Sequence, residues 1–220
     1  MKKRLIIFAA ALMLTVSAVL MPAAGVEAEE NKELDLIMVL DQSGSMQTND
    51  PNGMMKEAAN MLTAMMPAKT SRVGVISFNR EQTEVVGLRK LSEAEDVEEI
   101  ADEVDRIEYE GGTDIGNAIA DAVEMFDESD DRVHAILVLS DGRNDFGIDK
   151  NAEQASDERL YDALVTAQNQ NCQIYCLGFG EEMSNTDDIP YQKLDGIATD
   201  ADKISTETDP AKIHKFFLNM

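Results

Sequence analysis

Five oxygen-bearing side chains stand beside apolar runs or a glycine-rich turn, where they are placed to bind a metal ion. In chain order they are Asp41, Ser43, Ser45, Thr113 and Asp141. Two carboxylates and three hydroxyls suit a hard divalent cation and are poor ligands for zinc or copper. These residue types predict a site for Mg2+, with Mn2+ or Ca2+ as the alternatives.

The segments around these residues alternate between short apolar runs and longer amphipathic stretches. Strands are predicted at 34–40, 72–78, 84–88, 133–139, 173–179 and 203–205, and helices at 52–66, 92–107, 115–126, 153–170, 188–197 and 210–218. Strands alternating with helices indicate an α/β fold, with a parallel sheet covered by helices on both faces. The helix at 92–107 is expected to open with Ser92 as its cap, followed by a glutamate that completes a capping box.

The predicted strands explain how distant residues meet. In an open parallel sheet, ligands bind beyond the carboxyl ends of the strands, where the strand order reverses. Asp41 and Asp141 each follow an apolar run, and Thr113 begins the helix between them. Positions 41, 43 and 45 point the same way if their loop stays extended, and Gly44 allows a tight turn there.

Each of these residues also has an ordinary structural explanation. Thr113 or Asp114 could cap the helix that begins near Ile115, and Asp141-Gly142 is a common turn sequence. Asp41 is too far from the helix predicted near Asn52 to cap it. Caps and turns do not explain why oxygen ligands gather at the same edge of the sheet, whereas a metal site explains all of them together.

The same segments resemble a known family. Asp41-Gln42-Ser43-Gly44-Ser45 matches the Asp-x-Ser-x-Ser motif of von Willebrand factor A domains, also called integrin I-like domains. Gly111-Gly112-Thr113-Asp114 and Leu139-Ser140-Asp141-Gly142 match the family's later ligand segments in order and spacing. The resemblance covers about residues 33–219. It implies a single domain at 29–220 with a doubly wound, mostly parallel sheet flanked by helices on both faces.

The resemblance also implies a metal-ion-dependent adhesion site. Ser43, Ser45 and Thr113 would be direct or switching ligands there, and Asp41 and Asp141 would hold the metal directly or through water. The implied function is a protein-binding or adhesion module, in which an acidic residue of a protein or extracellular-matrix ligand completes the metal's shell. A structural or assembly component of a cell-envelope or pilus-like complex, with a non-exchanging metal, stays open as the alternative.

We do not expect catalysis from these residues. Phosphoryl-transfer enzymes with an Asp-x-Asp motif need a second carboxylate as general acid, and Ser43 stands in its place. The matched loops hold no lysine for a phosphate. His134 and His214 are isolated from any nucleophile elbow, and packing or surface roles are expected for them.

The amino terminus predicts export. Lys2, Lys3 and Arg4 precede an apolar run from Leu5 to Leu20, and Val26-Glu27-Ala28 has the small-x-small pattern of a signal-peptidase site. We therefore interpret residues 1–28 as a secretory signal, with an uncleaved membrane anchor as the alternative. The expected location is secreted or at the cell surface.

The net charge of the chain limits the classes of partner that it is expected to bind. With 43 acidic and 19 basic residues, its formal net charge is −24. Such a charge argues against nucleic acid or an anionic lipid surface, because phosphates would repel it. It favours solubility outside the cell, and it concentrates divalent cations and attracts basic partners.

Two cysteines, Cys172 and Cys176, lie four residues apart in a segment that is typical of a strand. In a strand that spacing covers about 13 Å, which exceeds the roughly 7 Å between Cα atoms that a disulfide allows. We expect both to be buried apolar residues, since a disulfide would require Cys172 to lie in the turn before the strand.

Overall fold

The computed structural model describes residues 33–80, 86–127, 131–206 and 209–220. The predicted signal at 1–28, and the alternative of an anchor, lie outside the described residues. Among the helices of the described residues, none is both long enough and apolar enough to cross a membrane.

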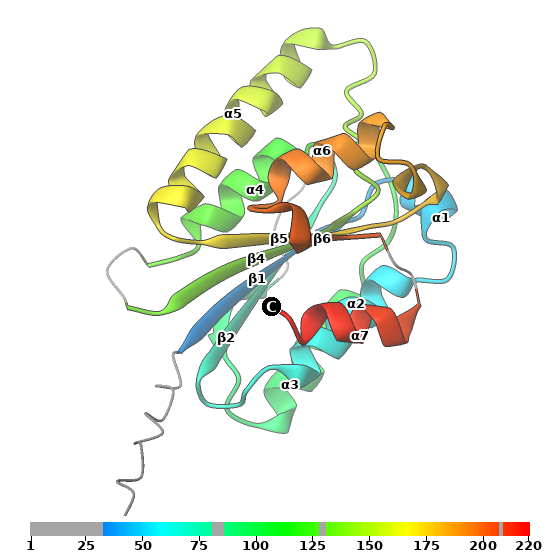
Figure 1. Cartoon of the computed structure of the whole chain (residues 1–220). Helices are drawn as coiled ribbons and strands as arrows, with labels where there is room; N and C mark the ends of the chain where they lie inside the picture. Colours follow the sequence, from blue (N-terminus) through cyan, green and yellow to red (C-terminus); the bar gives the residue numbers. More distant parts are fainter. Residues whose placement is uncertain (1–32, 81–85, 128–130, 207–208) are drawn as a thin grey trace, which may run out of the picture. The chain divides into compact units, whose positions relative to one another are not determined.

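A six-stranded sheet in the order β3-β2-β1-β4-β5-β6 forms the centre of the described domain (Figure 1). The strands are β1 (Leu34–Asp41), β2 (Ser71–Phe78), β3 (Val86–Lys90), β4 (Val133–Ser140), β5 (Gln173–Gly178) and β6 (Ile204–Ser205). Neighbouring strands are parallel except β2 and β3, which form the expected hairpin pair. The chain winds outward from β1 in both directions, so the prediction of a doubly wound, mostly parallel sheet is confirmed.

Helices cover both faces of this sheet. On one face lie α2 (Met54–Met65), α3 (Ala94–Asp105) and α7 (Pro210–Phe217), and on the other lie α4 (Ile115–Glu124), α5 (Lys150–Asn169) and α6 (Ile189–Ile197) (Figure 1). Successive side chains of β1 point to opposite faces of the sheet, so this strand contributes to both hydrophobic cores. Leu36, Met38 and Leu40 pack toward α2, and Ile37 and Val39 pack toward α4.

Three short elements of the described residues were not predicted from the sequence. They are the single-turn helix α1 (Met46–Asn49) and the 3-10 turns η1 (Glu181–Ser184) and η2 (Ala201–Lys203). Elements of three or four residues are too short to show a helical period. The helix α1 starts at once after the Asp-x-Ser-x-Ser motif, with Ser45 already in the α region. The motif therefore bends into a helix, and the extended loop considered from the sequence does not form.

The start of α3 also differs by one residue from the prediction. Its cap is Glu93, and the side chain of Asp96 closes the capping box by accepting from the backbone N–H of Ser92, at 2.7 Å, and of Glu93, at 2.9 Å. Ser92 was expected as the cap because serine is preferred there, but the chain turns helical one residue later. The two N–H donors lower the pKa of Asp96.

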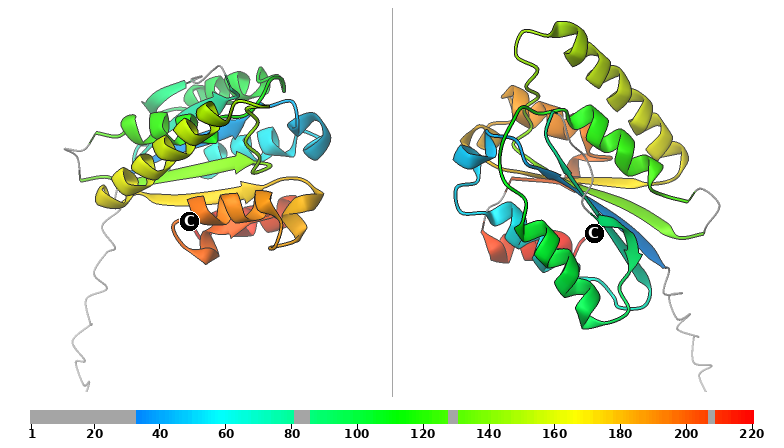
Figure 2. Two further views of the ribbon diagram at one scale, coloured as in Figure 1. Left: turned by 90° about the horizontal axis from the view of Figure 1, so that it is seen from above. Right: turned by 180° about the vertical axis from the view of Figure 1, so that it is seen from behind.

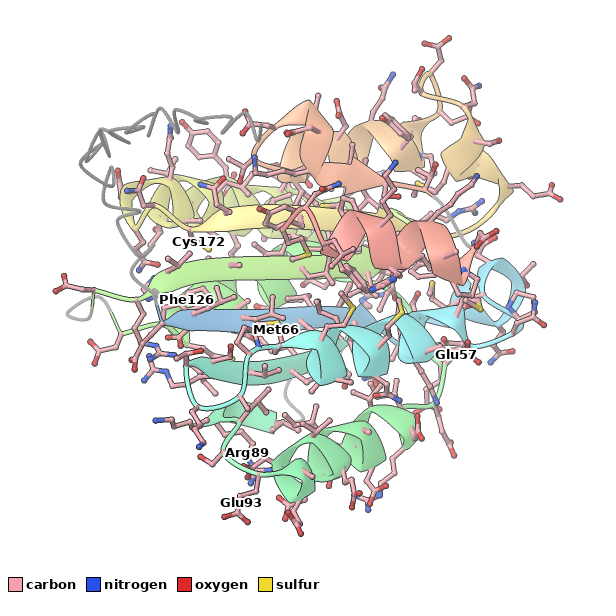
Figure 3. All side chains as sticks on the ribbon, turned by 60° about the horizontal axis from the view of Figure 1, so that its bottom comes forward. Glu57, Met66, Arg89, Glu93, Phe126 and Cys172 are labelled. Atoms are coloured by element: carbon pink, nitrogen blue, oxygen red, sulfur yellow. The ribbon has the colours of Figure 1, made fainter. Side chains whose placement is uncertain are left out.

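A buried ion-pair network, which was not predicted from the sequence, lies at the amino end of β1. Asp35 is completely buried, and its carboxylate pairs with Arg72 on β2 and with Arg132 beside β4. His134 lies 4.0 Å from the same carboxylate and stacks on Phe126, with the ring centroids 4.4 Å apart. Figure 3 shows Phe126 and Cys172 at this end of the sheet. The network satisfies a charge that burial would otherwise make costly.

Candidate metal centre

The pairing of β1 with β4 brings the two predicted carboxylates to one edge. The strands are parallel neighbours, with Leu40 opposite Leu139. Asp41 ends β1, and Asp141 follows the last residue of β4. Both side chains are buried, with 0% and 1% of their surface exposed. This edge is where the strand order reverses, the usual place for a ligand in a doubly wound sheet.

The first motif folds back on its own aspartate. The backbone N–H of Ser43 donates to Asp41 Oδ1 at 2.9 Å. The hydroxyl oxygens of Ser43 and Ser45 lie 3.0 Å apart, so the two serines meet even though the loop is bent. Gly44 is not among the residues with positive φ, and a Cβ there would make an ordinary contact of 3.4 Å with Gly111 O. The tight turn expected of Gly44 does not depend on a glycine.

The buried position of Asp41 disfavours the charged form of its carboxyl group. Burial raises its pKa to about 7, and the nearby charge of Asp141 adds to the rise. Hydrogen bonds from Ser140 and Ser43 lower the pKa and offset only part of that rise. Within the described part of the chain, no basic side chain forms an ion pair with Asp41 or Asp141.

Thr113 lies in a loop that contacts both other segments of the site. Its backbone pairs with Asp145, through Thr113 N to Asp145 O at 3.3 Å and Asp145 N to Thr113 O at 3.1 Å. On the other side, Gly44 N donates to Gly111 O at 3.0 Å. The cap of α4 is Asp114, which accepts from Asn117 N at 3.0 Å. Because Asp114 takes the capping role, capping does not explain the buried Thr113 side chain.

The residues present fit a hard divalent cation. Two buried carboxylates repel each other, and serine hydroxyls lie beside them. Mg2+, Mn2+ and Ca2+ accept such oxygen ligands. In the described residues, no group of three or more His, Cys, Asp or Glu side chains lies close enough to hold a metal ion, and the proposed site has two carboxylates with hydroxyls.

Two residues beside the site were not singled out from the sequence. Ser140 Oγ donates to Asp41 Oδ2 at 2.6 Å, and Asn49 Nδ2 donates to Asp141 Oδ2 at 2.8 Å. Ser140 stood within a matched motif but had no assigned role. Asn49 gave no signal, because its contact spans 92 residues of sequence.

The other residues considered from the sequence lie elsewhere. His134 is in the Asp35 network, and His214 is exposed on α7. Cys172 and Cys176 are both buried and free, as expected, even though Cys172 lies just before β5, the position that a disulfide would require. Burial raises the pKa of the Cys172 thiol to about 12, so that thiol stays protonated and unreactive near neutral pH.

Several known proteins are similar to this chain in sequence or in fold. The mouse inter-alpha-trypsin inhibitor heavy chain 4 is 26% identical over 188 residues, which cover 80% of this chain but 18% of that protein. A von Willebrand factor type A structure from Catenulispora acidiphila superimposes with a TM-score of 0.62 at 22% identity, over 86% of this chain and 42% of that one. The chain therefore spans less than half the length of these relatives.

Two further solved structures, of a pilus adhesin and of a matrix protein, share the fold. The pilus adhesin SpaC from Lactobacillus rhamnosus GG has a TM-score of 0.66 at 15% identity, over 86% of this chain and 30% of that one. Proximal thread matrix protein 1 from the mussel byssus has a TM-score of 0.61 at 18% identity, over 84% and 44%. A family model of the von Willebrand factor type A domain matches residues 35–219. With that match over most of its length, the chain belongs to the von Willebrand factor type A domain family.

Proposed function

We propose that this chain is a metal-dependent protein-binding module that works outside the cell. The observation that carries the proposal is the pair of buried carboxylates, Asp41 and Asp141, which face the same edge of the sheet without a basic partner among the described residues. A bound Mg2+, Mn2+ or Ca2+ would offset their charge and offer coordination positions to a partner's carboxylate.

The residues of the chain divide this task. Asp41 and Asp141 supply the negative charge that selects a cation, and Ser43 and Ser45 supply neutral oxygens beside it. Thr113 lies on the loop joined to both sides of the site, so a small shift of that loop changes how its hydroxyl meets the cation. Because five side chains do not fill the six or more oxygen positions of such a cation, a coordination position would stay open for an acidic partner.

The proteins that share this fold support recognition of a protein or matrix ligand. The similar structures include a pilus adhesin and a byssal matrix protein. A net charge of −24 keeps such a domain soluble and favours partners whose acidic residue lies in basic surroundings. We propose no catalysis, since Ser43 replaces the second carboxylate that an Asp-x-Asp enzyme needs.

Calorimetric titration with Mg2+ and Mn2+ tests the metal site. Wild-type protein should bind about one ion, and Asp41→Ala should abolish binding while the circular dichroism spectrum stays the same. Glu33→Ala, which removes an exposed carboxylate at the opposite end of β1, should bind like wild type. Equal binding by wild type and Asp41→Ala would overturn the proposal.

Capture of surface or matrix proteins, with and without EDTA, separates the two roles open to such a module. An exchangeable adhesion site predicts capture that EDTA abolishes. Copurification with partners regardless of EDTA would instead indicate a structural or assembly component with a non-exchanging metal. Export is tested by mass spectrometry of the secreted protein, which should begin near Glu29; retention of Met1 would support an anchor.

A further inference from the structure

Each carboxylate of the site accepts a hydrogen bond from a side chain outside the five predicted ligands. Asp41 Oδ2 accepts from Ser140 Oγ at 2.6 Å, and Asp141 Oδ2 accepts from Asn49 Nδ2 at 2.8 Å. The remaining oxygens accept backbone N–H groups, Ser43 N on Asp41 Oδ1 and Arg143 N on Asp141 Oδ1. Asp41 also has a side-chain hydrogen bond with Ser43. Ser140 and Asn49 are thus the side-chain donors from outside the ligand set, and both are electrically neutral.

The direction of the Ser140 hydroxyl is determined by its surroundings. The backbone N–H of Gly142 donates to Ser140 Oγ at 2.9 Å. An oxygen that accepts this bond directs its own proton elsewhere, and Asp41 Oδ2 is the acceptor within reach. Ser140 therefore joins Asp41 to the turn that carries Asp141. It is completely buried, so water does not compete for either bond.

Asn49 is also held in place. It ends α1, the helix that begins at the second serine of the first motif. Its side chain packs against the backbone of Gly180, where an added Cβ would lie 2.8 Å from Asn49 Cγ. The amide is thereby wedged between the loop after β5 and the Asp141 carboxylate. A shift of α1 would move the donor and Ser45 together.

We propose that Ser140 and Asn49 are positioning residues for the metal centre, which orient the two carboxylates without neutralising them. This inference rests on the proposed function, since it concerns the same cation. A lysine or arginine in either place would hold the carboxylate equally well but would take up the charge that attracts the cation. A neutral donor fixes the orientation and leaves the charge available.

Magnesium titration of the full chain as purified tests this role, with the metal alone as the probe. Ser140→Ala and Asn49→Leu should each weaken Mg2+ binding, by about 10- to 100-fold for partners that orient metal ligands. Ser140→Thr, which keeps the hydroxyl, should restore binding to near wild type.

Two matched variants control for burial and for the loss of a polar group. Ser71→Ala changes an equally buried serine at the opposite edge of the sheet. Asn60→Leu removes an amide on α2 that donates to Asp105 Oδ1, at the end of α3, at 3.1 Å. Both should bind Mg2+ like wild type.

Thermal unfolding in EDTA and in Mg2+ separates positioning from general stability. A purely structural residue lowers both melting temperatures equally, whereas a positioning residue reduces the increase that Mg2+ produces. If Ser140→Ala fails to fold, Asn49→Leu and Ser140→Thr still decide the question.

The outcomes distinguish this inference from the proposed function. No Mg2+ binding by wild type would overturn both. Binding that Asp41→Ala abolishes, but that Ser140→Ala and Asn49→Leu leave within about twofold of wild type, would overturn the positioning role alone, because outer partners of metal ligands are expected to have larger effects.

Discussion

The carboxylate of Asp114 accepts a hydrogen bond of 2.6 Å from Ser156 Oγ, which ties the start of α4 to α5 directly behind Thr113. Its other oxygen accepts from Arg159 at 2.8 Å. Figure 2 shows the two helices side by side. They approach so closely that a Cβ on Gly116 would lie 2.1 Å from Ser156 O. The loop of Thr113 is therefore anchored to α5, through the contacts of Asp114 with Ser156 and Arg159.

Replacement of Asp114 tests this anchor. Asp114→Ala removes the cap of α4 and leaves the buried Ser156 hydroxyl without its acceptor. We expect a loss of roughly 1–3 kcal/mol in the free energy of unfolding, measured in urea. Arg159→Ala, which removes only the half-exposed ion pair, should cost less than about 1 kcal/mol. Equal losses for the two variants would contradict the anchor.

The Asp35 network should dominate stability at the opposite edge. Asp35→Ala leaves Arg72 and Arg132 facing a buried space without their carboxylate, and breaking such a pair costs about 3–5 kcal/mol. Glu33→Ala removes only the exposed partner of Arg132 and should change stability by less than about 1 kcal/mol. Chemical unfolding of both variants gives the comparison.

The metal-free protein should gain stability when one site charge is removed. Asp41→Asn keeps the shape of the side chain but abolishes the buried charge that Asp141 repels. In EDTA at pH 8 we expect this variant to unfold at a higher temperature than wild type, by roughly 1–3 kcal/mol of stability, because an unpaired buried charge is costly. Addition of Mg2+ should stabilise wild type and leave the variant unchanged. A lower melting temperature for Asp41→Asn in EDTA would show that the charge is not destabilising.

Partner binding should depend on Thr113 more than metal binding does. In Thr113→Ala, the two serines and both aspartates remain to hold the cation, while the hydroxyl that adjusts to an incoming carboxylate is lost. Asp141→Ala should weaken both kinds of binding. Titrations of each variant with Mg2+, and then with the captured partner in saturating Mg2+, measure the two effects. Normal partner binding by Thr113→Ala would argue for a structural metal.

The sheet was predictable because its signals are local. The apolar runs before Asp41 and Ser140 are short and largely apolar, which suits strands that are covered on both sides. The helix after Gly53 shows its period in methionines and ends before Pro67. By contrast, Ser92 was expected as a cap because capping preferences are shared among several residues, and Glu93 served instead.

The sequence by itself determined the elements, their alternation and the oxygen-rich residues at the ends of two strands and the start of one helix. Hydrophobic periodicity and residue chemistry depend only on the residues within each segment. They can therefore be recognised without knowing which segments pack against one another. Only the tertiary structure decided that Ser140 lies beside Asp41, that Asn49 reaches Asp141, and that Arg132 closes on Asp35. These contacts join residues more than 90 positions apart. They depend on strand order and register, which arise from packing both faces of the sheet at once.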